Sequence, residues 1–179
     1  ERDVFLYSQP KAALKDFRVT STLDDTYKDG IFKLGVDLRN NGSTAGNMTL
    51  VYELLDANGK VVATGEKATN VAAGETRTVS FDQTLPDVKT WTSEAPNLYK
   101  LVMTVKENGK VNEIIPFNVG FRRIEIKPTE QLARNGKPYI CLFINGQPLK
   151  LKGVNIHEHN PATGHYMTEE LMQIGRAHV

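Results

Sequence analysis

The chain has 179 residues, of which 40% are hydrophobic and 24% charged, and its formal net charge is +1. These values are ordinary for a globular protein, and the length allows one domain and part of another. Scattered lysines and arginines argue against nucleic acid and membranes as partners, the single Cys141 excludes a disulfide within the chain, and no apolar run approaches the roughly 18–20 residues that span a bilayer.

The first ten residues resemble the end of an upstream domain more than a chain start. Val4–Tyr7 is apolar and predicts a strand, which Pro10 ends. Glu1–Asp3 has no feature of a signal peptide, so we expect the native N-terminus to lie upstream. Cytoplasm and periplasm therefore both stay open as locations.

From about Leu14 to Phe121, apolar and polar residues alternate with a period of two. Phe32, Leu34 and Val36, for example, alternate with polar residues or glycine, which predicts strands with one buried face. Turn residues separate seven predicted strands, at 14–22, 31–40, 46–56, 60–68, 75–83, 98–107 and 111–121. Short strands at this spacing are typical of an immunoglobulin-like or fibronectin-like β-sandwich.

The segment Trp91–Tyr99 lies between two of these strands. Its simplest interpretation is a crossing loop in which Trp91 and Tyr99 close the open end of the sandwich. Ligand binding is the less favoured alternative, because sugar binding by stacking needs several aromatic side chains on one face.

After the sandwich the pattern changes, and the mainly β chain is expected to begin a TIM (β/α)8 barrel. Arg122–Lys127 is predicted to be extended, and two apolar runs at 139–144 and 148–155 flank Asn145-Gly146, a strong hairpin signal. Met167–Met172 predicts a helix start with Thr168 as the cap. A hairpin, a strand with a polar end, a loop and a helix can open such a barrel.

The polar strand end carries the candidate site: Asn155, His157, Glu158 and His159 lie within five positions. His157 and His159 share a face of the strand, and with His165 or an acidic residue as a third ligand they form a zinc hypothesis. A second hypothesis makes them structural histidines. The favoured hypothesis is a substrate-facing polar rim, because sugar hydroxyls require donors and acceptors held on a rigid strand.

Four segments resemble motifs of the family-2 glycoside hydrolases, and most closely of their β-galactosidases. They follow the family's order: Arg2–Leu6 is similar to the closing strand of the jelly-roll domain, Trp91–Tyr99 to a Trp-x-x-Glu-x-Pro-x-Leu-Tyr signature, Gly120–Glu125 to the junction into the catalytic barrel, and Asn145–His159 to the first hairpin and barrel strand. The resemblance implies three parts: residues 1–10 from a jelly roll, 11–121 as the sandwich, and 122–179 as a truncated barrel.

The resemblance also implies a function. Members of the family are retaining hydrolases with an acid/base glutamate and a nucleophilic glutamate, both expected downstream of this chain. The position matching His157 lines the galactose subsite, with Asn155, Glu158 and His159 as its neighbours. A β-galactoside substrate, Mg²⁺, Na⁺ and a homo-oligomeric state are implied for the full-length parent, with no metal bound by this segment.

Two features depart from the family pattern. Ile156 stands where the β-galactosidases usually have arginine, and residues 173–179 resemble a translated sequencing adaptor, so His178 is assigned no function. Two alternatives stay open: a non-catalytic spacer or carbohydrate-binding sandwich, and a β-glucuronidase or β-mannosidase of the same family.

Overall fold

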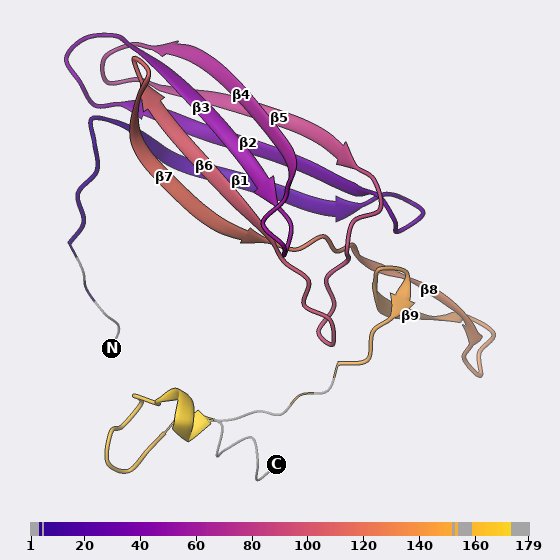
Figure 1. Ribbon diagram of the computed structural model, residues 1–179. Coiled ribbons are helices and arrows are strands. Elements are labelled where there is room, and N and C mark those ends of the chain that lie inside the picture. The colour runs from indigo at the N-terminus through magenta and orange to yellow at the C-terminus, as the bar shows by residue number, and fades with distance from the viewer. Residues whose placement is uncertain (1–3, 5, 152, 154–158, 173–179) are drawn as a thin grey trace. The chain divides into compact units, whose positions relative to one another are not determined.

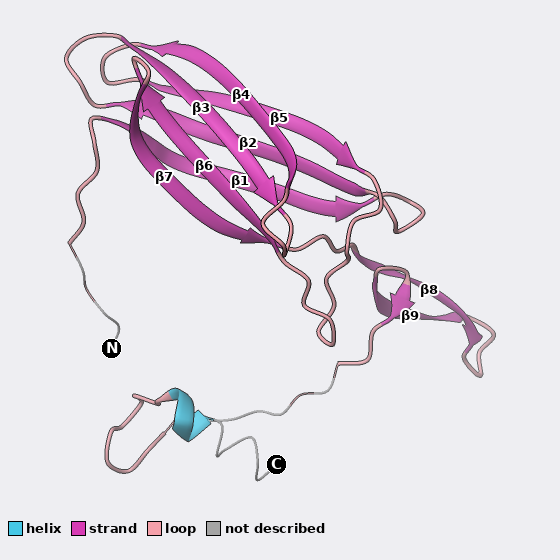
Figure 2. Cartoon of the chain, viewed as in Figure 1, coloured by secondary structure: helices cyan, strands magenta, loops and turns pink. Residues whose placement is uncertain are grey.

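The structure is a computed structural model that describes residues 4, 6–151, 153 and 159–172. Contacts divide the chain into two compact units, Ser8–Leu149 and the pair of segments Glu1–Tyr7 and Lys150–Val179. Strands dominate the first unit, as the colouring by secondary structure in Figure 2 shows.

Seven strands form two antiparallel sheets that face each other (Figure 1). The three-stranded sheet has the order β1–β2–β5, with β1 at Ala12–Leu23, β2 at Gly30–Asn40 and β5 at Thr76–Leu85. The four-stranded sheet has the order β4–β3–β6–β7, with β4 at Val61–Val71, β3 at Gly46–Leu55, β6 at Tyr99–Glu107 and β7 at Lys110–Val119. All seven strands predicted from alternation are confirmed. The chain changes sheet between β2 and β3, between β4 and β5 and between β5 and β6, which gives the crossing connections of a sandwich.

The core lies between the two sheets and follows from the alternation of the sequence. Phe32, Val36 and Leu38 of β2 are fully buried, as are Leu50 and Tyr52 of β3. Alternate residues point to opposite faces of a strand, so these side chains meet while their polar neighbours face solvent. The same pattern in β6 completes one continuous core.

A second, small antiparallel sheet follows the sandwich in the order β10–β9–β8, with β8 at Ile124–Leu132, β9 at Pro138–Ile144 and β10 at Gln147–Pro148. We call it the hairpin sheet. Asn145 and Gly146 turn the chain between β9 and β10 with φ angles of 48° and 77°, the positive pair that a two-residue type I′ turn requires.

The prediction of a long second hairpin strand at 148–155 is wrong over the described residues. Pairing ends at Pro148, and Leu149 makes one further backbone hydrogen bond, its N–H donating to the Leu142 carbonyl oxygen at 2.7 Å. Leu151 and Gly153 lie outside strands. Within the described part of the chain, no further strand offers backbone partners there, and an unpaired segment cannot satisfy a β-ladder.

Two other predictions from the sequence concern residues near the two ends of the chain. Val4, Leu6 and Tyr7 lie in no strand, because among the described residues none pairs with them; their assignment to a jelly roll remains a prediction. Near the other end, residues 169–172 are helical. Thr168 caps them as predicted, its side-chain oxygen accepting from the Leu171 N–H at 3.3 Å.

No helix in the described residues has both the length and the apolar character that crossing a membrane demands.

Candidate functional site

Only His159 of the predicted site residues can be placed, because Asn155, His157 and Glu158 lie outside the described residues. The His159 side chain is exposed. Its ring meets the ring of His165 edge to face, with centroids 5.5 Å apart and planes at 72°. The structure therefore brings together His159 and His165, one of the candidates for a third ligand in the zinc hypothesis.

A tight loop between the two histidines produces this contact. The backbones of Asn160 and Gly164 exchange two hydrogen bonds of 2.8 Å, and the Asn160 side-chain oxygen accepts from the N–H groups of Ala162 and Thr163. Gly164 closes the loop with a φ of 66°, a conformation that favours glycine. His159 and His165 flank this closed loop, so their imidazoles become neighbours.

Zinc coordination needs more than this pair supplies. Structural zinc sites have four ligands and catalytic sites three from the protein. Over the described residues, no three His, Cys, Asp or Glu side chains are grouped as metal ligands. The zinc hypothesis depends on His157 and therefore stays a prediction.

The loop Trp91–Tyr99 has the structural role that its simplest interpretation predicts. The Trp91 N–H donates to the Phe121 carbonyl oxygen at 2.8 Å, and the Tyr99 hydroxyl accepts from the Lys89 N–H at 2.9 Å. The Tyr99 ring is buried against Phe121, with centroids 5.2 Å apart. The loop thus fastens one end of the sandwich.

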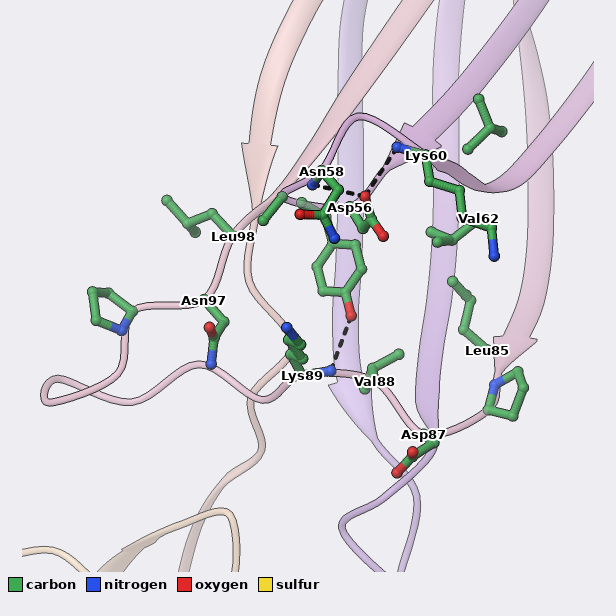
Figure 3. Close-up of a pocket in the computed structure, with 15 residues that line it drawn as sticks. Asp56, Asn58, Lys60, Val62, Leu85, Asp87, Val88, Lys89, Asn97 and Leu98 are labelled. Carbon is green, nitrogen blue, oxygen red and sulfur yellow. Dashed lines mark hydrogen bonds between the residues drawn. The ribbon is translucent and has the colours of Figure 1, made fainter.

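A cavity of about 570 Å³ opens beside this loop, between the β3–β4 turn and the β5–β6 connection (Figure 3). Several of its polar groups already form hydrogen bonds within the turn or connection that carries them. The Asp56 carboxylate accepts from the N–H groups of Asn58 and Lys60 at 2.8 and 2.9 Å, and the Tyr99 hydroxyl is occupied by Lys89. Tyr99 is the one aromatic residue among those lining the cavity, so the wall offers no stacking platform for a sugar.

Among the described residues, a group of charged side chains lies where the hairpin sheet meets the β1–β2 turn. The Tyr27 hydroxyl donates to Glu125 Oε2 at 2.7 Å and accepts from Lys127 Nζ at 2.9 Å. Arg123 forms ion pairs with Asp25 at 2.6 Å and with Glu125 at 3.2 Å. We call these five residues the junction network.

The junction network shifts its own titrations toward the charged forms. The Tyr27 hydroxyl lowers the pKa of Glu125 by hydrogen bonding, and the charges of Arg123 and Lys127 lower it further. The pKa of Lys127 is raised, first by its hydrogen bond to Tyr27 and then by the charge of Glu125. An ionised carboxylate held by three partners stabilises a contact, whereas a general acid needs a raised pKa. The network joins the hairpin sheet to the β1–β2 turn, and the lowered pKa of Glu125 does not suit a general acid.

Asn145 ties the hairpin turn to the sandwich loop. Its side-chain oxygen accepts from the Arg123 N–H at 2.9 Å, and its side-chain nitrogen donates to the Trp91 carbonyl oxygen at 3.0 Å. Gly146 follows directly, and a β-carbon on it would lie 2.7 Å from Cε2 of Tyr27. Through these contacts the hairpin sheet packs against the sandwich. The compact unit continues to Leu149.

No pattern in the sequence predicts that the five residues of the junction network come together. Tyr27 and Glu125 are 98 positions apart, and Tyr27 has a φ of 58°, which no local pattern around it signals. The resemblance identifies Gly120–Glu125 as a junction, and this is the signal in the sequence that points to the network.

The chain is similar in sequence to known proteins. The chain is 36% identical to a β-galactosidase of Priestia megaterium over 165 residues and 37% identical to one of Halalkalibacterium halodurans over 172 residues. These alignments cover 91% and 96% of the chain but 15% of each relative, so the chain spans about one seventh of the length of these relatives.

Solved structures share the fold at lower identity. A Bacteroides fragilis protein, proposed to be a β-galactosidase, superposes with a TM-score of 0.74 at 23% identity, covering 90% of this chain and 22% of that one. A Bacteroides uniformis β-glucuronidase superposes with a TM-score of 0.73 at 19% identity, covering 89% and 18%. The family model "Glycosyl hydrolases family 2" matches residues 12–122, which is more than half of the chain. The chain belongs to the glycosyl hydrolases of family 2.

Proposed function

We propose that this chain is part of a retaining β-galactosidase that hydrolyses terminal β-galactosides. The observation that carries the proposal is the identity of 36–37% with two β-galactosidases along 91–96% of the chain. The solved β-glucuronidases that share the fold are 19–24% identical. The two curated galactosidases therefore carry the preference for galactose, since among the solved structures a proposed β-galactosidase, at 23% identity, is no more similar than the β-glucuronidases.

The reaction divides between this chain and the rest of the parent. Retaining glycosidases use two carboxyl groups, one as nucleophile and one as acid/base, and pass through a covalent glycosyl-enzyme. We propose that both glutamates lie outside this chain. His157 is proposed to contact galactose, with Asn155, Glu158 and His159 beside it.

Mg²⁺ and Na⁺ belong to this proposal only for the full-length parent. In the part of the chain that the structure describes, carboxylates and imidazoles do not group as a metal site.

A second candidate function is a β-glucuronidase of the same family, which the superposition with Bacteroides uniformis β-glucuronidase favours. A carbohydrate-binding module has less support, because the cavity beside the Trp91–Tyr99 loop has a single aromatic residue in its wall.

The test is a substrate comparison on the full-length parent and on the 179-residue chain. The parent should hydrolyse nitrophenyl β-galactoside with a kcat/KM at least tenfold above those for the β-glucuronide and the β-mannoside, and the chain alone should show background rates. His157→Asn in the parent should lower kcat and kcat/KM together, by about 1–3 kcal/mol of transition-state binding, because one hydrogen bond to the sugar is lost. Preference for the glucuronide would overturn the substrate, and turnover by the chain alone would overturn the division of roles.

A further inference from the structure

Five asparagines of the chain are each followed directly by a glycine. They are Asn41, Asn58, Asn108, Asn135 and Asn145. Asparagine is a chemically unstable residue, and a following glycine favours its reaction because no β-carbon hinders the approach of the glycine nitrogen to the asparagine side chain. How the fold holds these two groups therefore decides which of the five asparagines can react.

In three of the five pairs the glycine nitrogen already has a hydrogen-bond partner. The donors and acceptors are Gly42 N–H to Asn40 Oδ1 at 2.8 Å, Gly59 N–H to the Asp56 carbonyl oxygen at 3.0 Å, and Gly136 N–H to the Ala133 carbonyl oxygen at 2.9 Å. Such a nitrogen has to leave its partner before it can attack a side chain, which costs free energy.

The two remaining pairs form the same kind of turn. Asn108 and Gly109 join β6 to β7 with φ angles of 49° and 82°, close to the 48° and 77° of Asn145 and Gly146. Two positive φ angles in a two-residue hairpin define a type I′ turn. The two pairs thus share sequence and backbone conformation, and their surroundings decide any difference in reactivity.

The surroundings of Asn145 hold its side chain in place. Both polar atoms of the side chain are used, one by the Arg123 N–H and the other by the Trp91 carbonyl oxygen. A β-carbon on Gly146 would lie 2.7 Å from Cε2 of Tyr27, so the turn is also packed. Reaction at Asn145 requires that these contacts break.

The surroundings of Asn108 leave it open. Its backbone N–H donates to the Asn47 carbonyl oxygen at 3.1 Å, but its side chain is exposed. In the part of the chain that the structure describes, neither this side chain nor the Gly109 N–H has a hydrogen-bond partner. A β-carbon on Gly109 would meet no atom within 4 Å. Of the five pairs, this one combines an unbound nitrogen, an unbound side chain and open space.

We propose that Asn108 is a site of spontaneous covalent modification, at which the side-chain amide becomes a carboxylate through a cyclic imide. The deprotonated Gly109 nitrogen attacks the side-chain carbonyl carbon of Asn108, and the new N–C bond closes the imide ring. The side-chain nitrogen takes up the proton and leaves as ammonia. Water then opens the ring at either carbonyl group, which gives aspartate or isoaspartate. Water is the only co-reactant, and nothing is oxidised or reduced.

The isoaspartate product does not fit the β6–β7 turn. It adds a methylene group to the backbone of a two-residue turn, between the paired residues Glu107 and Lys110. Both products also place a carboxylate next to that of Glu107, and like charges repel. Because β7 is the outer strand of its sheet, its first residues should separate from β6 as the products accumulate.

The test is to age the folded 179-residue chain at mildly alkaline pH, where more of the glycine nitrogen is deprotonated. Peptide mapping by mass spectrometry follows all five asparagines, since exchange of NH2 for O–H changes the mass, and an isoaspartyl methyltransferase detects the isoaspartate. Asn108 should react roughly tenfold or more faster than Asn145, because two hydrogen bonds must break before Asn145 reacts. In urea, where the fold is lost, this difference should disappear.

Two variants measure the effect of the modification on the turn. Asn108→Gly retains the type I′ turn and has no amide to react, whereas Asn108→Asp carries the charge of the products without the added methylene. The aged unaltered chain should melt roughly 2–4 °C below the fresh chain. Aged Asn108→Gly should melt with its own fresh sample, and fresh Asn108→Asp should melt between the fresh and the aged unaltered chain.

Reaction of Asn145 at the rate of Asn108 in the folded chain would overturn the proposal, as would an intact Asn108 after the other asparagines have reacted. A rate difference that persists in urea would assign it to the neighbouring sequence and overturn the structural argument. An equal loss of melting temperature in aged Asn108→Gly would overturn the effect on the β6–β7 turn. None of these measurements depends on which sugar the parent hydrolyses, so the proposed function can fail while this site stands.

Discussion

Gly146 is the residue with the most constrained position in the hairpin sheet. Its φ of 77° suits a glycine, and a β-carbon there would lie 2.7 Å from Cε2 of Tyr27. Gly136, in the β8–β9 turn, has a similar φ of 75° but no atom within 4 Å of the same position. Substitutions at the two glycines therefore distinguish the free-energy cost of the backbone conformation from the cost of the contact with Tyr27.

Gly146→Ala should therefore destabilise the chain more than Gly136→Ala. Both variants should lose about 1 kcal/mol from the left-handed backbone conformation. Gly146→Ala should lose a further 1–3 kcal/mol or so, because Tyr27 must shift and strain the junction network. Urea unfolding followed by the fluorescence of Trp91, the only tryptophan, measures both losses. Equal losses would show that Tyr27 moves away freely.

Asp24 shapes the β1–β2 turn that carries Tyr27. Its pKa is lowered to about 2, chiefly by the hydrogen bond from the Thr26 hydroxyl, with further bonds from the N–H groups of Asp29 and Lys28. A carboxyl whose pKa is lower in the folded chain stabilises the fold above its unfolded pKa, near 3.9, and this stability is lost as the pH falls through the folded value.

The resulting prediction is a pH window between about 4 and 2. Asp24→Asn keeps an oxygen that accepts hydrogen bonds but does not titrate. The unaltered chain should be the more stable at pH 6, and the difference in urea midpoint should shrink as the pH falls through the window. A constant difference at all pH values would mean that the Asp24 charge does not contribute.

At the scale of elements, the sequence predicts what depends on local pattern. Alternation between apolar and polar residues located all seven sandwich strands to within a few residues, because a half-buried strand imposes a period of two. Asn145-Gly146 located the hairpin turn, because the type I′ turn needs two positive φ angles. Both rules act over a few residues and need no knowledge of distant contacts.

The sequence does not predict contacts between elements that lie far apart along the chain. Composition and spacing around β8 do not show that Glu125 binds Tyr27, nor that Asn145 reaches the backbone of Trp91. The length of β10 was overestimated for a similar reason, since an apolar run becomes a strand only where a neighbour offers backbone partners. Of the candidate site, the sequence named His159 and His165, and the Asn160–Gly164 loop that brings their rings together was not anticipated.

Asn145 gives the sharpest test of the docking of the hairpin sheet. Asn145→Gly retains the turn, because glycine adopts its φ of 48° freely, but removes the two side-chain hydrogen bonds to Arg123 and Trp91. We expect a loss of about 1–2 kcal/mol and faster amide hydrogen exchange in β8 and β9. Asn135→Gly is the control, because its side chain accepts only a local hydrogen bond from the Lys137 N–H. Unchanged exchange in the Asn145 variant would contradict a docking role.

At the scale of the whole molecule, the compact unit and the family match end at different residues. The family model ends at residue 122, whereas the compact unit extends to Leu149. The difference is the hairpin sheet, which the junction network and Asn145 fasten to the sandwich. A segment belongs to a folding unit through its contacts, so the hairpin sheet should unfold together with the sandwich even if it belongs to the catalytic domain by descent.

Limited digestion with trypsin should reveal this boundary in the 179-residue chain. Arg123 and Lys127 are held in ion pairs on the docked face of the hairpin sheet, so the bonds after them should resist cleavage. Lys150 follows the last residue of the compact unit, is exposed and lies outside strands, so cleavage there should come early, as it should after Arg134 in the exposed β8–β9 turn, where the β8–β9 ladder keeps the two pieces together. Mass spectrometry should identify a persistent core ending at Lys150. In Asn145→Gly the bonds after Arg123 and Lys127 should be cut sooner, because the hairpin sheet separates more often from the sandwich. A core that ends near residue 122 in the unaltered chain would show that the junction network does not hold in solution.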